Sequence, residues 1–302
     1  MTGNTIHQPA AVQKTTHPVM RVIVALINDR LALCGLIMLA IFVLLALFAP
    51  LLSPQNPYDL MQLDIMDGRL APGAQSMAGM MYWLGTDDQG RDLFSAILYG
   101  TRISLIVGFS SAVLALLIGA SLGLISAYVG GKTDATIMRI VDIQLSFPPI
   151  LIALILLAVL GQGVDKIIMA LVVTQWAYYA RTIRGSALVE RRRSYVDAAR
   201  SMALSNRRIL FRHILPNCLA PLIVVATMRI AYAIMLEATL SFLGIGLPVT
   251  EPSLGLLISN GFEYLMSGDY WISFFPGLTL LLLIVAINLV GDALRDILNP
   301  RN

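Results

Sequence analysis

Charged residues are scarce in this 302-residue sequence, where Asp, Glu, Lys and Arg together make up 13% of the residues. Soluble domains carry roughly 25%. Apolar residues reach 57%, and the mean hydropathy is +0.78. A soluble chain of this length could not bury so much apolar surface in one core. The scarcity of charge therefore excludes an ordinary soluble enzyme and indicates lipid as a second solvent.

Cysteine and histidine are also rare. Cys34 and Cys218 lie in apolar runs without CxxC spacing, which excludes a disulfide framework and indicates small buried hydrophobes. The three histidines lack paired metal-ligand spacing. No Gly-x-Ser-x-Gly elbow occurs, and Ser126 stands where a phosphate-binding loop ending at Thr133 would need its first glycine. We therefore expect no catalytic residue, no metal site and no cofactor bound by this chain.

Long apolar runs are what the sequence does have. A helix needs roughly 20 apolar residues to cross a hydrocarbon core of about 30 Å. The predicted fold is accordingly an all-α integral membrane protein with six transmembrane helices. The first run is too long for the core of a signal peptide. The six runs are Leu31–Leu52, Ile103–Tyr128, Ile137–Leu160, Ile167–Ala180, Cys218–Leu243 and Trp271–Val290.

The distribution of Lys and Arg predicts the orientation of the spans. Residues 181–217 hold nine arginines and two acidic residues, whereas residues 53–102 hold six Asp and three Arg. Residues 244–270 contain no basic residue. Both termini and the Arg-rich segment are therefore expected on the cytoplasmic side. The predicted divisions are 1–30 (cytoplasmic), 31–52 (first span), 53–102 (external loop with an interfacial helix), 103–290 (transmembrane core, including 181–217) and 291–302 (cytoplasmic tail).

Residues 181–217 are too polar to cross a membrane, and their pattern predicts two short amphipathic helices. Apolar positions recur at helical spacing over residues 195–202. Ser205 or Asn206 can cap a second helix, which Pro216 is expected to end. The pattern alone leaves two interpretations open. The segment could lie on the lipid surface with its arginines on phosphates, or it could dock into a groove on a partner protein.

The stretch YVDAARSMALSNRRILFRHILPN, residues 195–217, resembles the EAA signature of ABC importer permeases. In that family the segment forms a coupling helix that sits in a cleft of the ATPase subunit. Asp197 replaces the usual Glu. Ala203 takes the place of Gly, which costs on the order of 1 kcal/mol if the turn is left-handed. The residues that the resemblance assigns to coupling are Asp197, Ala198, Ala199, Arg200, Ala203, Ile214, Leu215 and Pro216. The resemblance implies that Ala199→Glu would uncouple ATP hydrolysis from uptake while the chain stays folded.

A second stretch, LGTDDQGRDLFSAILYGTRISLIVG (residues 84–108), resembles the entry to the second span in the dipeptide/oligopeptide/nickel branch of that family. Ala96 stands where the branch usually has Arg. Glycines and an acidic residue near a helix start predict a turn and a cap. Contact with an external binding protein is the alternative interpretation. The residues of this external motif are Gly85, Asp87, Gly90, Arg91 and Asp92.

Ionisable and helix-breaking residues within spans usually have a specific role. Asp142 is expected to reach the membrane surface or to pair with Arg139. For Glu237 we expect a bond to a neighbouring helix or to a partner permease, with a polar wall of the substrate path as the alternative. Two adjacent prolines in the third span predict a kink and leave a gating hinge open. The candidates for a translocation path or hinge are Glu237, Ser241, Pro148 and Pro149.

The resemblance implies a type I ABC importer permease that moves di- or oligopeptides across a bacterial inner membrane by alternating access. It also implies four kinds of neighbour: a lipid membrane, a second homologous permease, two ATPases that carry ATP and Mg²⁺, and an extracytoplasmic substrate-binding protein. No nucleic-acid partner is expected. A secondary transporter or channel not driven by ATP is the alternative, and it would predict inverted repeats and a self-sufficient ion site. The sequence has no repeat at half its length.

Overall fold

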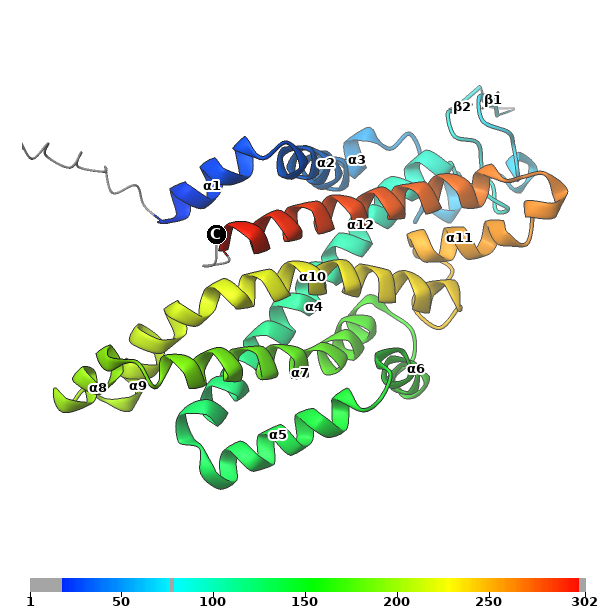
Figure 1. Cartoon of the computed structure of the whole chain (residues 1–302). Helices are drawn as coiled ribbons and strands as arrows, with labels where there is room; N and C mark the ends of the chain where they lie inside the picture. Colours follow the sequence, from blue (N-terminus) through cyan, green and yellow to red (C-terminus); the bar gives the residue numbers. More distant parts are fainter. Residues whose placement is uncertain (1–17, 77–78, 299–302) are drawn as a thin grey trace, which may run out of the picture.

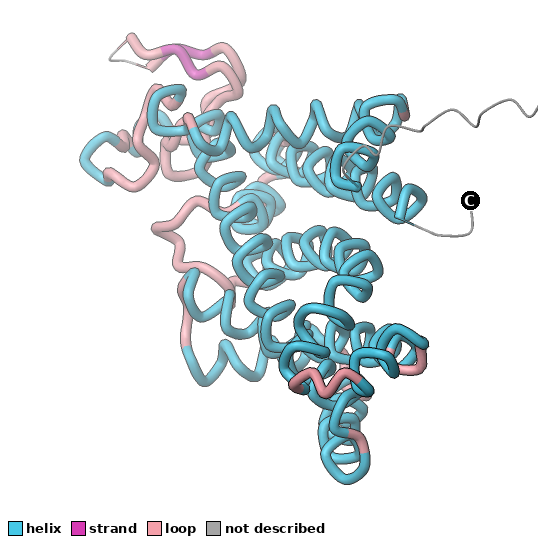
Figure 2. The backbone as a smooth tube through the Cα atoms, turned by 90° about the vertical axis from the view of Figure 1, so that its left-hand side faces the viewer, coloured by secondary structure: helices cyan, strands magenta, loops and turns pink. Residues whose placement is uncertain are grey.

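The structure is a computed structural model, which describes residues 18–76 and 79–298. The predicted cytoplasmic lead before residue 18 and the end of the predicted tail from residue 299 lie outside the described residues. The described part is helical apart from loops and one antiparallel pair of short strands, β1 (Ala74–Gln75) and β2 (Met81–Tyr82). These strands lie at the opposite end of the molecule from α8 (Ser194–Ser201), as Figures 1 and 2 show.

Long helices make up the body of the molecule, and α4 crosses behind α7 and α10 (Figure 1). The helices in the first half are α1 (Pro18–Asn28), α2 (Arg30–Leu47), α3 (Ala49–Leu52), α4 (Leu93–Val129) and α5 (Gly131–Leu145). Those in the second half are α6 (Pro149–Leu160), α7 (Val164–Glu190), α8, α9 (Asn206–Arg208), α10 (Leu215–Phe242), α11 (Leu254–Phe262) and α12 (Trp271–Leu298). Short 3-10 turns occur at Leu60–Gln62, Ile65–Asp67 and Leu265–Ser267, and a π-helical stretch occurs at Ile209–Ile214.

Four helices in the described residues are long and apolar enough to cross a membrane. They are α2, α4, α12 and the continuous helix Asn206–Phe242 that contains α10. The bent pair α5 and α6 makes a fifth if it counts as one span. α7 contains the predicted fourth span, but only 14 residues separate Lys166 from Arg181, so its apolar stretch is short. The described helices thus support four or five spans, and the sixth stays a prediction.

The predicted third span is broken rather than kinked. α5 and α6 meet at 89°, with Pro148 as the residue before α6 and Pro149 in its first turn. Two adjacent prolines remove two N–H donors, and a proline also disfavours the helical conformation of the residue before it. The chain therefore ends one helix and starts another in a new direction.

α4 and α7 approach each other so closely that glycine is required at the contact. A Cβ atom added at Gly119 would lie 2.2 Å from the carbonyl oxygen of Trp176, and one added at Gly123 would lie 2.2 Å from that of Ala180. Small residues that let backbones approach are a principal source of helix association in lipid. This contact joins α4 to the helix that leads into the Arg-rich segment.

Two ion pairs join α5 to α7. The Arg184 guanidinium donates to both carboxylate oxygens of Asp134, at 2.5 and 2.6 Å. Asp142 pairs with Arg181 and not with Arg139, so the sequence-based choice of partner was wrong. Arg139 and Asp142 lie on the same helix, but α5 packs along α7 and brings Arg181 within reach of Asp142.

We predict that Gly123→Ala destabilises the protein by about 1–3 kcal/mol, because its methyl group must push α7 away from α4. A lower thermal transition of the purified protein in detergent checks this. Gly185→Ala is the matched control, since a Cβ atom there meets nothing within 4 Å. That change should be neutral or stabilising in a helix. Equal transitions for the two variants would contradict the proposed contact.

Candidate functional site

The Arg-rich segment forms a helical hairpin that consists of α8, the turn 202–205 and the helical stretch that begins at Asn206. We call it the Arg-rich hairpin. Its apolar face packs on α4 and α7, in one core cluster with Leu124 and Ile183. The predicted pair of amphipathic helices is therefore present. The buried residues of the hairpin are Val196, Ala199, Ile209, Leu210 and Ile214.

Pro216 does not end the second helix, contrary to the sequence-based expectation. The helical path runs from Asn206 through the π-helical stretch Ile209–Ile214 into α10 without a break. Proline lacks an N–H donor, and here it lies in the first turn of α10 directly after the wider π geometry. The hairpin is consequently joined to a membrane-spanning helix by continuous helix rather than by a flexible loop.

The turn of the hairpin is left-handed at Ala203, where φ is +54°. The N–H of Ala203 donates to the carbonyl oxygen of Arg200 at 2.9 Å, and that of Leu204 donates to the carbonyl oxygen of Ala199 at 3.2 Å. This pair of bonds is the Schellman arrangement that ends many helices, usually with Gly in the left-handed position. Ala203, which stands where the signature has Gly, thus adopts the left-handed turn conformation.

Tyr195 links three parts of the site. Its hydroxyl donates to Oε2 of Glu190 at 2.6 Å, at the end of α7, and accepts from Nδ2 of Asn217 at 3.2 Å, at the start of α10. Burial raises the pKa of Tyr195 to about 12, and the hydrogen bond to Glu190 acts in the same direction. The phenol therefore stays protonated at neutral pH and keeps its donor.

Ala199 is only 4% exposed, whereas Ala198 beside it is exposed. A glutamate at 199 would bury a carboxylate in the apolar cluster. This burial argues against the expectation that Ala199→Glu leaves the chain folded. Asp197 and Met202 are exposed like Ala198, and Met202 shows 73% of its surface. The outer face of the hairpin is formed by these residues and not by Ala199.

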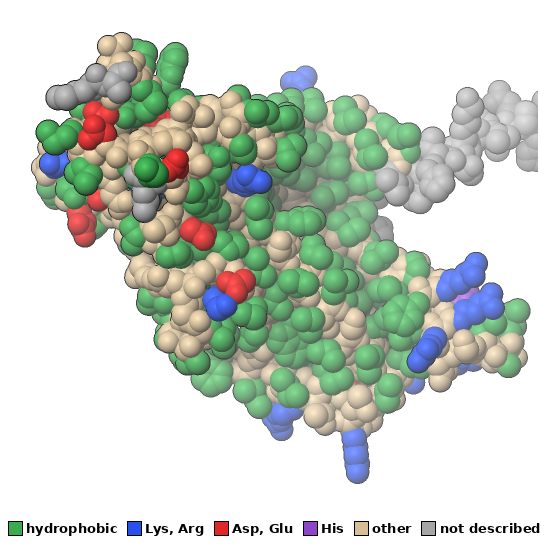
Figure 3. Space-filling view, turned by 180° about the vertical axis from the view of Figure 1, so that it is seen from behind, with side chains coloured by type: hydrophobic (Ala, Val, Ile, Leu, Met, Phe, Trp, Pro, Cys, Tyr) green, Lys and Arg blue, Asp and Glu red, His purple; other side chains and the backbone are tan. Residues whose placement is uncertain are grey.

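The nine arginines of the segment divide into two groups. Five contact another residue of the chain: Arg181, Arg184, Arg191, Arg193 and Arg200. The other four are exposed and have no partner in the part of the chain that the structure describes: Arg192, Arg207, Arg208 and Arg212. Figure 3 shows basic side chains gathered at this end and most acidic ones at the opposite end. The hairpin thus presents free positive charge to a partner or a surface.

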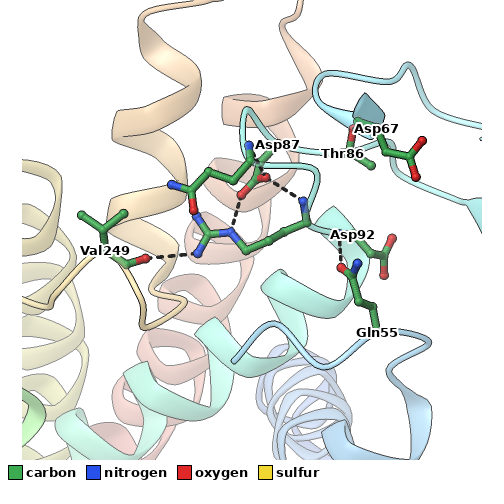
Figure 4. A network of polar contacts seen from close by, with 8 residues as sticks. Gln55, Asp67, Thr86, Asp87, Asp92 and Val249 are labelled. Atoms are coloured by element: carbon green, nitrogen blue, oxygen red, sulfur yellow. Dashed lines mark hydrogen bonds and ion pairs between the residues drawn. The ribbon is translucent and has the colours of Figure 1, made fainter. Parts of the chain in front are cut away.

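The external motif forms a buried polar network at the start of α4 (Figure 4). The Arg91 guanidinium pairs with Asp87 at 2.7 Å and donates to the carbonyl oxygen of Val249 at 3.1 Å. Asp92 caps α4, since its carboxylate accepts from the N–H of Ser95 at 2.9 Å. All five residues of the motif are buried: Gly85, Asp87, Gly90, Arg91 and Asp92. Their burial favours the predicted capping role over contact with a binding protein.

The turn before α4 leaves no space for a side chain at Gly90. Its φ is +76°, and an added Cβ atom would lie 2.1 Å from the carbonyl oxygen of Asp64. In the same region the Tyr82 hydroxyl donates to Oδ2 of Asp67 at 2.9 Å. Burial raises the pKa of Tyr82 to about 12, so this donor also persists at neutral pH. The loop before α4 is therefore a folded cap.

Glu237 lies fully buried within the chain and faces three hydroxyl groups. Its Oε2 accepts from Ser104 of α4 at 2.9 Å, and its Oε1 accepts from Ser241 and Ser253, both at 2.9 Å. The expected bond to a neighbouring helix is present, because Ser104 belongs to α4 and Ser253 directly precedes α11. A role for Glu237 or Ser241 in the substrate path stays a prediction.

A cavity of about 380 Å³ lies beside the break between α5 and α6. It contains a feature that the sequence reasoning missed: the Arg229 guanidinium lies over the ring of Tyr178, 3.4 Å from its centroid. No spacing rule could have found this contact, because Tyr178 belongs to α7 and Arg229 to α10. The residues that line the cavity are Pro149, Tyr178, Val225, Met228, Arg229 and Tyr232.

Two family profiles match the sequence. The profile described as "Binding-protein-dependent transport system inner membrane component" matches residues 119–302. A second, "N-terminal TM domain of oligopeptide transport permease C", matches residues 19–72. The first match contains the Arg-rich hairpin, the cavity and Glu237.

Curated relatives of similar length support the same family. The chain is 38% identical to the dipeptide transport system permease protein DppC of Alkalihalophilus pseudofirmus, over 91% of this chain and 87% of that protein. It is 40% identical to DppC of Haemophilus influenzae, over 91% and 92%. The oligopeptide transport system permease protein OppC of Bacillus subtilis is 38% identical, over 91% and 87%.

Among solved structures, the fold is similar to an inward-facing conformation of the MetNI methionine ABC transporter. The TM-score is 0.56 at 22% identity, and the match covers 68% of this chain and 96% of that one. At this identity the likeness concerns the fold alone.

We predict that Ala203→Gly stabilises the hairpin by about 1 kcal/mol, because glycine adopts the left-handed turn without a Cβ penalty. Slower amide exchange in α8 or a higher thermal transition checks this. Ala198→Gly, within α8 itself, is the matched control, and it should destabilise by about 1 kcal/mol. The two changes should thus act in opposite directions, and a shared sign would refute the account of the turn.

Proposed function

Because the chain belongs to the family of binding-protein-dependent transport system inner membrane components, we propose that it is the permease subunit of an ATP-driven peptide importer. The relatives are named as dipeptide and oligopeptide permeases, and the similarity extends over 91% of the chain. The chain is a multi-pass protein of the inner membrane. Family membership argues against the alternative of a transporter or channel that is not driven by ATP.

The coupling role rests on one observation, which is that the Arg-rich hairpin packs on α4 and α7 and is continuous with α10. Its inner face is packed on α4 and α7, and its outer face offers Asp197, Ala198 and Met202. A partner that grips this outer face can displace α10 as a rigid body, because helix connects the two. We assign that partner role to an ATPase subunit, with the hairpin and both termini on the cytoplasmic side and six spans in all.

The packing of α8 supports docking on a protein over attachment to lipid. A helix that lies on a membrane needs a free apolar face to insert between lipids. The apolar residues Val196 and Ala199 of α8 are already buried against the chain itself. What remains outside is the surface of Asp197, Ala198 and Met202, next to four arginines that have no partner among the described residues, which suits a groove with acidic residues.

A complete transporter under this proposal contains a second homologous permease, two ATPases that bind ATP and Mg²⁺, and an extracytoplasmic binding protein. Substrate passes between the two permeases as the ATPases close and open. The break at Pro148 and Pro149 supplies a place where α5 and α6 can change their angle without breaking further backbone hydrogen bonds. This chain contributes no catalytic residue to the cycle.

The proposal predicts that Ala198→Glu abolishes ATP-driven peptide uptake while the chain still folds. The added carboxylate lies on the exposed face, where it would repel a groove that accepts basic side chains. The measurement is uptake of a labelled dipeptide by vesicles that contain both permeases and the ATPases, with the binding protein added. ATP hydrolysis should continue without uptake or fall to its basal rate.

Ala135→Glu is the matched control, because it adds the same charge at an exposed alanine of α5, outside the hairpin. It should leave uptake within about twofold of the unaltered protein. Full uptake by the Ala198→Glu transporter would remove the basis for the docking role.

A further inference from the structure

Arg229 is a cation near the middle of α10, in a helix apolar enough to span a membrane. A charge at such a depth is expensive and usually faces protein or water. No ion pair joins Arg229 to a carboxylate anywhere in the described ranges 18–76 and 79–298. Glu237 lies two turns further along α10, and its oxygens are taken by three serines. No carboxylate of the described residues thus neutralises the positive charge of Arg229.

Two tyrosines hold the guanidinium in place. Its central carbon lies 3.4 Å from the ring centroid of Tyr178 and 5.4 Å from that of Tyr232. A guanidinium stacked on a ring uses its flat face for that contact. Its N–H groups lie in the plane and stay available for a planar acceptor such as a carboxylate. None of these N–H groups has a protein acceptor among the described residues.

The surroundings of Arg229 are open and favour an anion. Arg229 lines the cavity of about 380 Å³, within the size range of small-ligand sites. Pro149, in the first turn of α6, lines the same cavity. The N-terminal end of a helix carries partial positive charge, so α6 adds to the field of Arg229. The cavity therefore combines a fixed cation, a helix N-terminus and a broken span.

We propose that Arg229 binds the C-terminal carboxylate of the peptide as it crosses the membrane. The inference rests on the proposed function and names the substrate group that this site recognises. A permease that carries peptides of different sequence can depend only on groups common to all of them, and the terminal carboxylate is one. A stacked guanidinium that lines a cavity matches that group in charge, planarity and hydrogen bonding.

The test compares uptake of dialanine and of dialanine amide, which lacks the carboxylate charge. Vesicles contain the complete transporter with ATP, and initial rates are expressed per peptide-loaded binding protein. Arg229→Gln should lower dialanine uptake roughly tenfold to hundredfold, the effect of one lost charge-assisted bond. Amide uptake should change by less than about twofold. The binding protein is the same in both transporters, so a change in the ratio of the two rates arises in this chain.

Two further variants keep the test decisive if Arg229→Gln impairs assembly. Val225→Asp places a carboxylate one turn from Arg229 in the same cavity and should capture the guanidinium, with the same loss of dialanine uptake. Val225→Asn, its uncharged counterpart, should leave the rate ratio unchanged. Arg102→Gln removes an exposed arginine of α4 and serves as the control for loss of a positive charge.

Three outcomes would overturn the inference. If Arg229→Gln lowers the uptake of both peptides equally, Arg229 has a structural role or forms an ion pair with the second permease. If Val225→Asp leaves the ratio of dialanine to dialanine amide uptake unchanged, the same conclusion follows. In both cases the unaltered transporter still takes up dialanine, so the proposed function stands. Failure of the unaltered transporter to take up either peptide would overturn the proposed function as well.

Discussion

A low-dielectric surrounding admits a charge only where another group compensates it, and the arrangement of this protein follows from that constraint. On the face that Figure 3 shows, a group of Lys and Arg side chains lies at the hairpin end, and the Asp and Glu side chains lie toward the opposite end. Within the helices, Glu237 faces three hydroxyls and Arg229 rests on tyrosine rings. Glu237 lies where helices meet, and Arg229 lies where a cavity opens.

The proposed coupling between ATPase and path depends on helical continuity. The hairpin leads through a π-helical stretch into α10, and α10 carries both Arg229 and Glu237. α4 and α7 contact each other closely at Gly119 and Gly123, and the apolar face of the hairpin packs on these two helices. Under this proposal, a movement at α8 reaches the middle of α10 through backbone hydrogen bonds and direct packing. A flexible linker at Pro216 would have separated the two.

Several features could be predicted because they depend on residues close in the chain. Apolar runs indicated the spans, and helical spacing indicated the hairpin. The Gly place in the signature raised the question of a left-handed turn, and Ala203 adopts one. An acidic residue before an apolar run indicated a cap, and Asp92 caps α4. Each of these inferences needs only local backbone geometry and the solvent preference of side chains.

Other features depend on how helices distant in the chain pack against each other. Asp142 pairs with Arg181 because α5 lies along α7, and helical spacing pointed instead to Arg139. Ala199 is buried and Ala198 is exposed because one side of α8 faces α4 and α7. The sequence of two adjacent alanines does not indicate which of them lies on that side. The 89° break between α5 and α6 required a structure, since two prolines indicate a bend without its angle.

The sequence by itself determined that this is a helical membrane protein with a basic hairpin, because hydropathy and charge act residue by residue. Tertiary structure alone decided which charges are neutralised and which are left free. Neutralisation requires two side chains within a few ångströms. For Asp134 and Arg184, which lie 50 residues apart in the chain, that distance is set by the packing of α5 on α7.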